Sequence, residues 1–340
     1  MLYGELVELD SPVSRSKISV EGFHAFHGSL LQFSEDDRLL VAGIGDNVCV
    51  YDLQNGSLIS VLAIPAEKES SGRFFYPHAR SVSVSTEAGV VAAGDNSGWV
   101  STWSLEDARM LSHVKGPGQS FVAFFGRAET VPRKFGIGRR RAPQYRRSLL
   151  VGSGEQLAVW DARGWHQVSF ESRGGVYPYV ECVSGSTTGT LIAATRDTNA
   201  VYLFQKNLDH FRVANRWSLN GAISRVLFSR DSTKLYVATS AGGVILSVPE
   251  LLQIGVFGAE ETCDVGVSGD SSIIASSYTV DRQYHGVPRR RNSLAIWQMG
   301  AGHIRDYDFS DRAISVAISN DARVVAARVL GGQVFITRAR

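Results

Sequence analysis

Cysteine and methionine are scarce in this 340-residue chain, with three of each, and long apolar runs are missing. Cys49, Cys182 and Cys263 are odd in number, far apart and without a CxxC pair, so neither a disulfide framework nor a zinc site is expected. No stretch approaches the roughly 18 uninterrupted apolar residues of a membrane span. Segment 1–10 carries three acidic residues and no apolar run, unlike a secretory signal. These absences predict an intracellular protein, cytoplasmic or nuclear, with reduced thiols.

Glycine is comparatively frequent, at 34 residues, while hydrophobic residues make up 44% and charged residues 20%. This composition is globular and suits a β protein rich in turns. A chain of this length would ordinarily suggest two domains. An architecture built by radial repetition avoids that limit, because each added unit brings its own core. We therefore looked first for an internal repeat.

One pattern of three short strands returns seven times along the chain. Its first strand alternates and often ends in Ser: 30–34, 80–85, 120–124, 180–184, 225–229, 265–268 and 315–319. Its second strand has two large residues followed by small ones: 39–43, 90–94, 149–153, 191–195, 235–239, 273–277 and 324–328. Its third strand often ends in an aromatic residue: 48–52, 100–104, 157–161, 201–205, 244–248, 294–298 and 334–338. The copies lie about 40 to 60 residues apart, and four short strands in each such period are the signature of a propeller blade. A β-sandwich also has short strands but gives no reason for seven copies.

The segments 95–104, DNSGWVSTWS, and 156–161, QLAVWD, resemble the blade ending of the WD-repeat family. The resemblance extends over essentially the whole chain and implies an all-β fold, a seven-bladed β-propeller of four-stranded antiparallel blades, as a single domain over 1–340. It also departs from the family, because His24, nine residues before Phe33, is the only histidine at the usual spacing. The family's buried Asp–His–Ser/Thr–Trp hydrogen-bond network is therefore expected to be absent from most blades.

The seventh copy ends after its third strand and lacks an outer strand. Residues 3–9 precede the first complete copy and can supply that strand. Pairing the N-terminal strand with the last blade would close the ring and remove exposed strand edges. The propeller itself is expected to be monomeric.

Three insertions interrupt the repeat, and loops on rigid scaffolds are where function concentrates. Segment 63–80 joins blades one and two, segment 126–147 follows the first strand of blade three, and segment 278–293 follows the second strand of blade six. In a WD-type blade, 63–80 and 278–293 would lie on the top face, and 126–147 on the opposite face.

Positive charge is concentrated in two of these insertions. Segment 126–147 has net charge +7 and segment 279–293 has +3, so the rest of this +2 chain sums to −8. Basic loops on a mildly acidic body indicate an anionic partner, RNA or an acidic protein surface. The alternative is a solvated insertion whose charges bind nothing. The candidate partner-binding residues are Arg133, Lys134, Arg139, Arg140, Arg141, Arg146, Arg147, Arg289, Arg290 and Arg291.

Aromatic residues gather in the loops expected on the top face. Aromatics together with arginines are typical of protein interfaces, although some could instead plug the channel mouth or pack under their own loops. The candidate interface residues are Phe74, Phe75, Tyr76, Tyr177, Tyr179 and Tyr284, with Tyr278 beside them. Ser293 follows an arginine run, as in a site for a basophilic kinase, but it opens a strand and favours a structural hydroxyl.

Catalytic machinery is not evident in the sequence. His24 and His27 have no third metal ligand, and the segments around Gly136 and Gly152 lack the strand–helix context of a phosphate loop or nucleophile elbow. Asp36, Asp231, Asp270 and Asp321 follow first strands and are interpreted as turn residues. No catalytic residue, cofactor or metal is predicted. The sequence favours a protein-interaction scaffold in a larger assembly; the alternatives are an RNA- or ribonucleoprotein-contacting propeller and, less favoured, a propeller enzyme.

Overall fold

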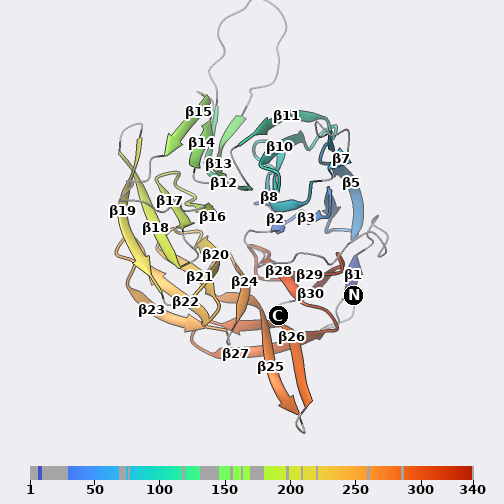
Figure 1. The fold of residues 1–340 in the computed structure, drawn as a ribbon, viewed down its shortest axis with the longest axis vertical. Helices are drawn as coiled ribbons and strands as arrows, with labels where there is room; N and C mark the ends of the chain where they lie inside the picture. Colours follow the sequence, from blue (N-terminus) through green and yellow to red (C-terminus); the bar gives the residue numbers. More distant parts are fainter. Residues whose placement is uncertain are drawn as a thin grey trace, which may run out of the picture.

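The structure, a computed structural model, describes residues 7–9, 30–68, 74–75, 77–116, 119–130, 145–153, 156–161, 164–168, 180–196, 199–207, 210–219, 221–258, 261–284 and 287–338. These residues form seven four-stranded antiparallel sheets arranged as blades around a central axis (Figure 1). The predicted seven-bladed propeller is confirmed. Among the described residues, no helix is long and apolar enough to cross a membrane.

The blades follow one another in chain order. In the first six blades the chain passes from the inner strand to the outer strand, and in blade seven it fills the three inner positions. Blades one to three are β2 (Leu31–Phe33), β3 (Leu39–Ile44), β4 (Asn47–Asp52), β5 (Ser57–Ala63); β8 (Ala79–Ser85), β9 (Val90–Asp95), β10 (Trp99–Ser104), β11 (Met110–Lys115); and β12 (Ser120–Thr130), β13 (Tyr145–Ser153), β14 (Gln156–Asp161), β15 (Gly164–Val168). Blades four and five are β16 (Val180–Gly185), β17 (Leu191–Arg196), β18 (Ala200–Asn207), β19 (His210–Ser218); and β20 (Ile223–Phe228), β21 (Lys234–Thr239), β22 (Gly242–Ser247), β23 (Gln253–Phe257). Blades six and seven are β24 (Thr262–Val267), β25 (Ile273–Tyr284), β26 (Val287–Gln298), β27 (Gly302–Phe309); and β28 (Ala313–Ile318), β29 (Val324–Val329), β30 (Val334–Arg338) with β1 (Val7–Leu9). A small hairpin, β6 (Glu67–Lys68) and β7 (Phe74–Phe75), lies in the connection from blade one to blade two.

The ring closes as the sequence predicts. Strand β1 pairs antiparallel with β30, with Val7 opposite Ile336 and Leu9 opposite Val334. Leu9 is buried and packs in a cluster that combines residues of blades seven and one. The last blade therefore takes its outer strand from the beginning of the chain.

The apolar core lies between blades rather than within them. One cluster joins Val41 of blade one to Val84 and Trp103 of blade two, and the others likewise combine neighbouring blades. The small residues of the second strands allow this close stacking. A Cβ added to Gly94 in β9 would overlap the backbone of Ser120 in blade three, so this position accepts only glycine.

Side chains of the inner strands also bond to the backbone of the next blade. The hydroxyl oxygens of Ser81 and Ser83 in blade two accept hydrogen bonds from the backbone amides of Val122 and Phe124, at 2.7 and 2.9 Å. Equivalent bonds, here called seam bonds, join Gln32 to Val84, Cys182 to Val226, Ser184 to Phe228, Asp264 to Val316 and Ser315 to Leu30. Ser224 makes the reverse bond and donates to the carbonyl of Thr262 at 3.0 Å. Blade six also keeps one link of the WD-repeat network, since Trp297 Nε1 donates to Ser276 Oγ at 3.1 Å.

Asp264 is the acid among the side chains that make seam bonds, and 1% of its surface is exposed. Its Oδ2 accepts hydrogen bonds from Ser315 Oγ at 2.7 Å and Val316 N at 2.9 Å, and its Oδ1 lies 3.5 Å from Arg225 Nε. Burial raises the pKa of Asp264 above its usual value, while Arg225 and the hydrogen bonds oppose that shift. The carboxylate therefore ties together blades five, six and seven.

The first-to-second turns of four blades are built on a Ser-x-Asp motif, which confirms the turn interpretation of these acids. The serine donates to the aspartate two residues later at 2.6 Å in Ser34–Asp36, Ser229–Asp231 and Ser268–Asp270, and at 2.7 Å in Ser319–Asp321. The residue after the aspartate adopts a left-handed conformation in all four turns. The residue between serine and aspartate is thus presented at the end of the channel.

Arg328 in β29 is a buried arginine at a position where the other second strands have glycine, serine or threonine. It is 5% exposed, and its Nε and Nη1 have no hydrogen-bond partner among the described residues. Burial lowers the pKa of Arg328 to about 10, partly opposed by Cys49 and Tyr51. Burial also raises the pKa of the Cys49 thiol to about 11. A charged guanidinium therefore faces a neutral thiol at physiological pH.

Replacing Arg328 with Met is expected to raise the free energy of unfolding, by about 1–4 kcal/mol, because the cost of burying an unpaired charge disappears. Urea denaturation at pH 7 followed by tryptophan fluorescence measures this change. Arg323→Met is the matched control, since Arg323 lies in the same blade with its guanidinium 81% exposed. A destabilised Arg328→Met protein would contradict this account of the site.

Candidate interaction surfaces

The larger basic insertion begins as an extension of blade three. Strands β12 and β13 continue beyond the blade, with Glu129 opposite Arg146 and Thr130 opposite Tyr145. Arg146 and Arg147 thus lie in β13, although their side chains are not among the described features. The other candidates in this segment, Arg133, Lys134, Arg139, Arg140 and Arg141, lie outside the described residues.

The second basic insertion is a β-ribbon rather than a loop. Strands β25 and β26 pair without interruption from Ile273–Gln298 to Tyr284–Val287, and both are 12 residues long. They project from the ring in Figure 1. Arg289, Arg290 and Arg291 lie in β26 opposite Arg282, Asp281 and Val280, with side chains outside the description. β-Branched residues such as Val280 and Val287 continue the strand pattern into this segment. The arginine run at 289–291 made the same segment look like a loop in the sequence.

Two residues assigned to this insertion belong to the blade interior. Tyr278 is 8% exposed, so its expected place on an exposed interface is wrong. Ser293 is fully buried and donates to Asp308 Oδ1 at 2.7 Å, a structural role that agrees with the sequence interpretation. A kinase could not reach this hydroxyl in the folded blade.

The aromatic candidates are only partly placed. Phe74 and Phe75 form β7, and Tyr284 ends β25, but their side chains are not described. Tyr76, Tyr177 and Tyr179 lie outside the described residues. Their role at an interface stays a prediction. Of the cysteines, Cys49 and Cys182 are buried, whereas Cys263 is partly exposed.

One end of the central channel is surrounded by residues that each follow a serine at the start of a first-to-second turn. We call this set the mouth ring: Glu35, Thr86, Thr187, Arg230, Gly269 and Asn320. Neighbouring members contact each other. Thr86 donates to Glu35 Oε2 through its amide and hydroxyl, at 2.9 and 3.0 Å, and Thr187 Oγ1 donates to the carbonyl of Arg230 at 2.6 Å. The amide of Gly269 donates to the carbonyl of Asn320 at 2.9 Å.

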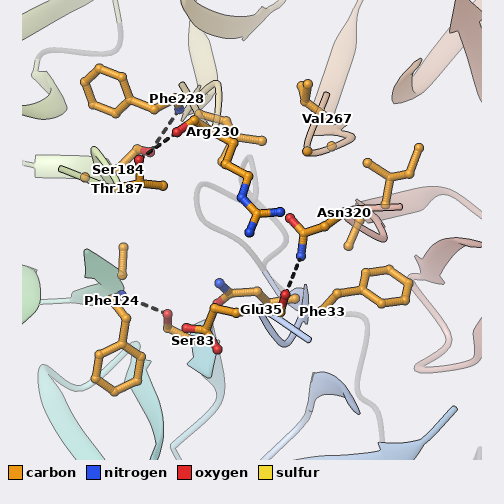
Figure 2. Close-up of a pocket in the computed structure, with 18 of the residues that line it drawn as sticks. Phe33, Glu35, Ser83, Phe124, Ser184, Thr187, Phe228, Arg230, Val267 and Asn320 are labelled. Atoms are coloured by element: carbon orange, nitrogen blue, oxygen red, sulfur yellow. Dashed lines mark hydrogen bonds between the residues drawn. The ribbon is translucent and has the colours of Figure 1, made fainter. Parts of the chain in front are cut away.

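Asn320 closes this ring between blades seven and one. Its side-chain amide donates to the carbonyl of Glu35 at 3.3 Å and to Asp37 Oδ1 at 3.0 Å, and its backbone amide donates to the same Asp37 oxygen. The amide of Asn320 is therefore held in one orientation at the edge of the channel (Figure 2).

Arg230 differs from the other ring members because its side chain makes no bond within the ring. Only its backbone carbonyl is engaged, and no hydrogen bond or ion pair of its guanidinium occurs among the described residues. The side chain extends over Gly269 toward Asn320, into the cavity (Figure 2). A Cβ on Gly269 would lie 3.2 Å from Arg230 Nη1 and 2.9 Å from the carbonyl oxygen of Asn320. Glycine at this position leaves space beside the guanidinium of Arg230.

Behind the mouth ring lies a cavity of about 490 Å³, lined by all seven blades. Its wall combines polar residues with apolar ones, among them Ala123, Leu227, Val267 and Ile318 from four inner strands. Gly126 also lines it, so the extended β12–β13 hairpin leaves the ring at this same end. The β25–β26 ribbon turns at the other end of its blade, because successive strands are antiparallel.

A row of apolar side chains marks the outside of blade five. Leu252, Ile254 and Val256 are 63%, 55% and 72% exposed, in or beside the outer strand β23. Sequence reasoning missed both this row and the mouth ring. The alternating apolar residues of this row resemble the pattern of a buried strand in the sequence. The members of the mouth ring become recognisable only when the serines of the first-to-second turns are aligned.

Comparison with known proteins supports the fold. The chain has the fold of the WD-repeat β-propellers, although no protein-family model matches its sequence and no curated protein is significantly similar. It is similar to the β-propeller domain of Cps50 (Swd1) from Myceliophteria thermophila, with a TM-score of 0.70 and 13% identity over 99% of this chain and 100% of that one. A chain in the mitotic checkpoint complex has a TM-score of 0.68 and 17% identity, covering 97% of this chain and 96% of that one.

Proposed function

We propose that this protein is a non-catalytic scaffold that binds other proteins as a subunit of a larger assembly. The apolar row Leu252, Ile254 and Val256 is the observation that carries this proposal. Exposed apolar side chains on an edge strand invite aggregation unless a partner covers them, so such rows mark protein contacts. The similar propeller in the mitotic checkpoint complex is part of a complex, which agrees with this role.

The polar groups of the inner strands support a structural rather than catalytic use of the channel wall. Ser81, Ser83, Ser184 and Asp264 are buried and engaged in seam bonds. Within the described residues, no group of three or more His, Cys, Asp or Glu side chains is placed to hold a metal ion. The basic segment 126–147 then provides a second contact, through Arg139, Arg140, Arg141, Arg146 and Arg147, to an acidic protein surface.

Replacing Leu252, Ile254 and Val256 with Thr is expected to remove at least one partner from affinity-purified complexes, because the lost apolar burial weakens the contact. Mass spectrometry of complexes from cells expressing wild-type and variant protein measures the change. Leu111→Thr is the matched control, since Leu111 is an exposed apolar residue on an outer strand, β11 of blade two, without a row of exposed apolar neighbours there. Recovery of an unchanged set of partners by the triple variant would contradict the proposal.

Charge reversal of the five arginines to Glu tests the basic segment. Partner recovery should fall strongly without loss of folding, because the rest of the chain is net negative. With a folded acidic protein, salt should mainly slow association. If RNA is the partner instead, about five phosphate contacts on a single strand would give a log–log salt slope of roughly −3.5. Unchanged recovery by this variant would leave segment 126–147 as a solvated insertion.

A further inference from the structure

We propose that the mouth ring and the cavity behind it bind a single carboxylate carried on an aliphatic group, presented by a peptide segment of a partner. This inference rests on the proposed scaffold function and deepens it by assigning a third, distinct docking site. The shared chemistry is a carboxylate beside aliphatic side chains. Either a chain terminus or an acidic side chain supplies it.

The anionic part of this ligand follows from Arg230. The other polar side chains of the ring are committed to bonds with neighbouring blades, whereas the Arg230 guanidinium extends unengaged into the cavity. A guanidinium presents a planar set of donors that fits a carboxylate. The fixed amide of Asn320 stands beside it as a further polar contact.

The charge of the ligand is limited by the same cavity. Glu35 and Glu87 also line it, so the described wall carries two acids near one free cation. Both acids repel any anion, but they repel a doubly charged phosphate about twice as strongly as a carboxylate, whose single charge Arg230 can neutralise. The cavity therefore favours a carboxylate over a phosphate.

The apolar part of the ligand follows from the wall behind the ring. Leu227, Val267 and Ala123 are partly exposed to the cavity, so an aliphatic side chain entering it would bury apolar surface. A volume of about 490 Å³ lies within the range of pockets for ligands of a few residues. A wide mouth with one polar anchor at its edge suits the end or bend of a peptide.

Four pools of fluorescein-labelled octapeptides, built from Leu, Val, Ile and Ala, test the site by fluorescence polarisation. One pool has a central Glu and an amidated end, and its counterpart has Gln in place of Glu. A third has no Glu and a free terminal carboxylate, and its counterpart is amidated. One carboxylate pool should bind the wild-type protein about tenfold more tightly than its neutral counterpart. The pool that binds identifies the source of the carboxylate.

Arg230→Gln should reduce that binding about tenfold. Arg323→Gln is the matched control and should bind as wild type, because Arg323 lies in a turn at the same end of the ring but does not line the cavity. Val267→Trp should also reduce binding by filling the cavity. If Arg230→Gln binds as wild type, if neutral and acidic pools bind alike, or if neither acidic pool binds, the proposal is wrong. If complexes keep all their partners with Arg230→Gln but lose one when Leu252, Ile254 and Val256 are replaced with Thr, the scaffold function is supported and the carboxylate site is not.

Discussion

Protein lacking residues 1–10 is expected to aggregate or unfold at much lower urea concentrations than the full chain. The deletion removes β1, so the backbone of β30 loses its partner along Val334, Phe335 and Ile336. It also removes Leu9, and loss of a buried leucine side chain alone costs about 2–5 kcal/mol. An unpaired edge strand then invites pairing with another copy. Size-exclusion chromatography with light scattering and urea denaturation measure both effects.

Deletion of residues 1–5 is the matched control, because it shortens the chain at the same end and keeps β1. Leu9→Asp gives an intermediate case in which the strand remains but its buried contact is lost. A monomeric Δ1–10 protein as stable as the full chain would show that the pairing of β1 with β30 contributes nothing to closure.

Asp264→Ala is expected to lower the free energy of unfolding by about 3–5 kcal/mol. The substitution leaves Arg225 without its ion-pair partner at a site where its side chain is only 13% exposed. It also leaves the amide of Val316 and the hydroxyl of Ser315 without their acceptor. The cost therefore comes from the groups left behind in blades five and seven, and the urea midpoint at pH 7 reports it.

Two further variants separate this explanation from a general effect of removing an acid. Asp270→Ala removes a turn carboxylate that accepts from Ser268 and Ser272, and should cost about 1 kcal/mol. The double variant Arg225→Met with Asp264→Leu should recover part of the loss, because no buried charge remains. If the double variant is less stable than Asp264→Ala, the explanation that the unpaired charge of Arg225 causes the loss of stability is refuted.

Most of the fold could be predicted from the sequence because the repeat has a strong local signal. Most first strands end near a serine and most second strands pass from large to small residues, so strands and turns are fixed by nearby residues. The exception is the ribbon of β25 and β26. Its run Arg289–Arg291 indicates a solvated loop locally, yet cross-strand pairing continues through it, and pairing depends on a partner strand that a single segment does not reveal.

The candidate site was harder to predict because its parts come from different blades. Arg230 and Gly269 are 39 positions apart in the chain, yet a Cβ on Gly269 would lie only 3.2 Å from Nη1 of Arg230. Nothing near Arg230 in the sequence distinguishes it from any other turn residue. Its significance depends on which neighbouring polar groups are already engaged, and that becomes visible only once the ring is closed.

The seam bonds place unequal demands on the two blades that they join. On one side a particular side chain is needed, such as Ser83 or Ser184, whereas the other side contributes a backbone amide that every residue except proline possesses. Substitutions at Phe124 or Phe228 can therefore change the side chain without breaking the bond. Evolutionary drift in one blade need not be matched by its neighbour, so propellers can retain the same architecture at 13% identity. The same freedom leaves few fixed residues by which a family description could recognise this chain.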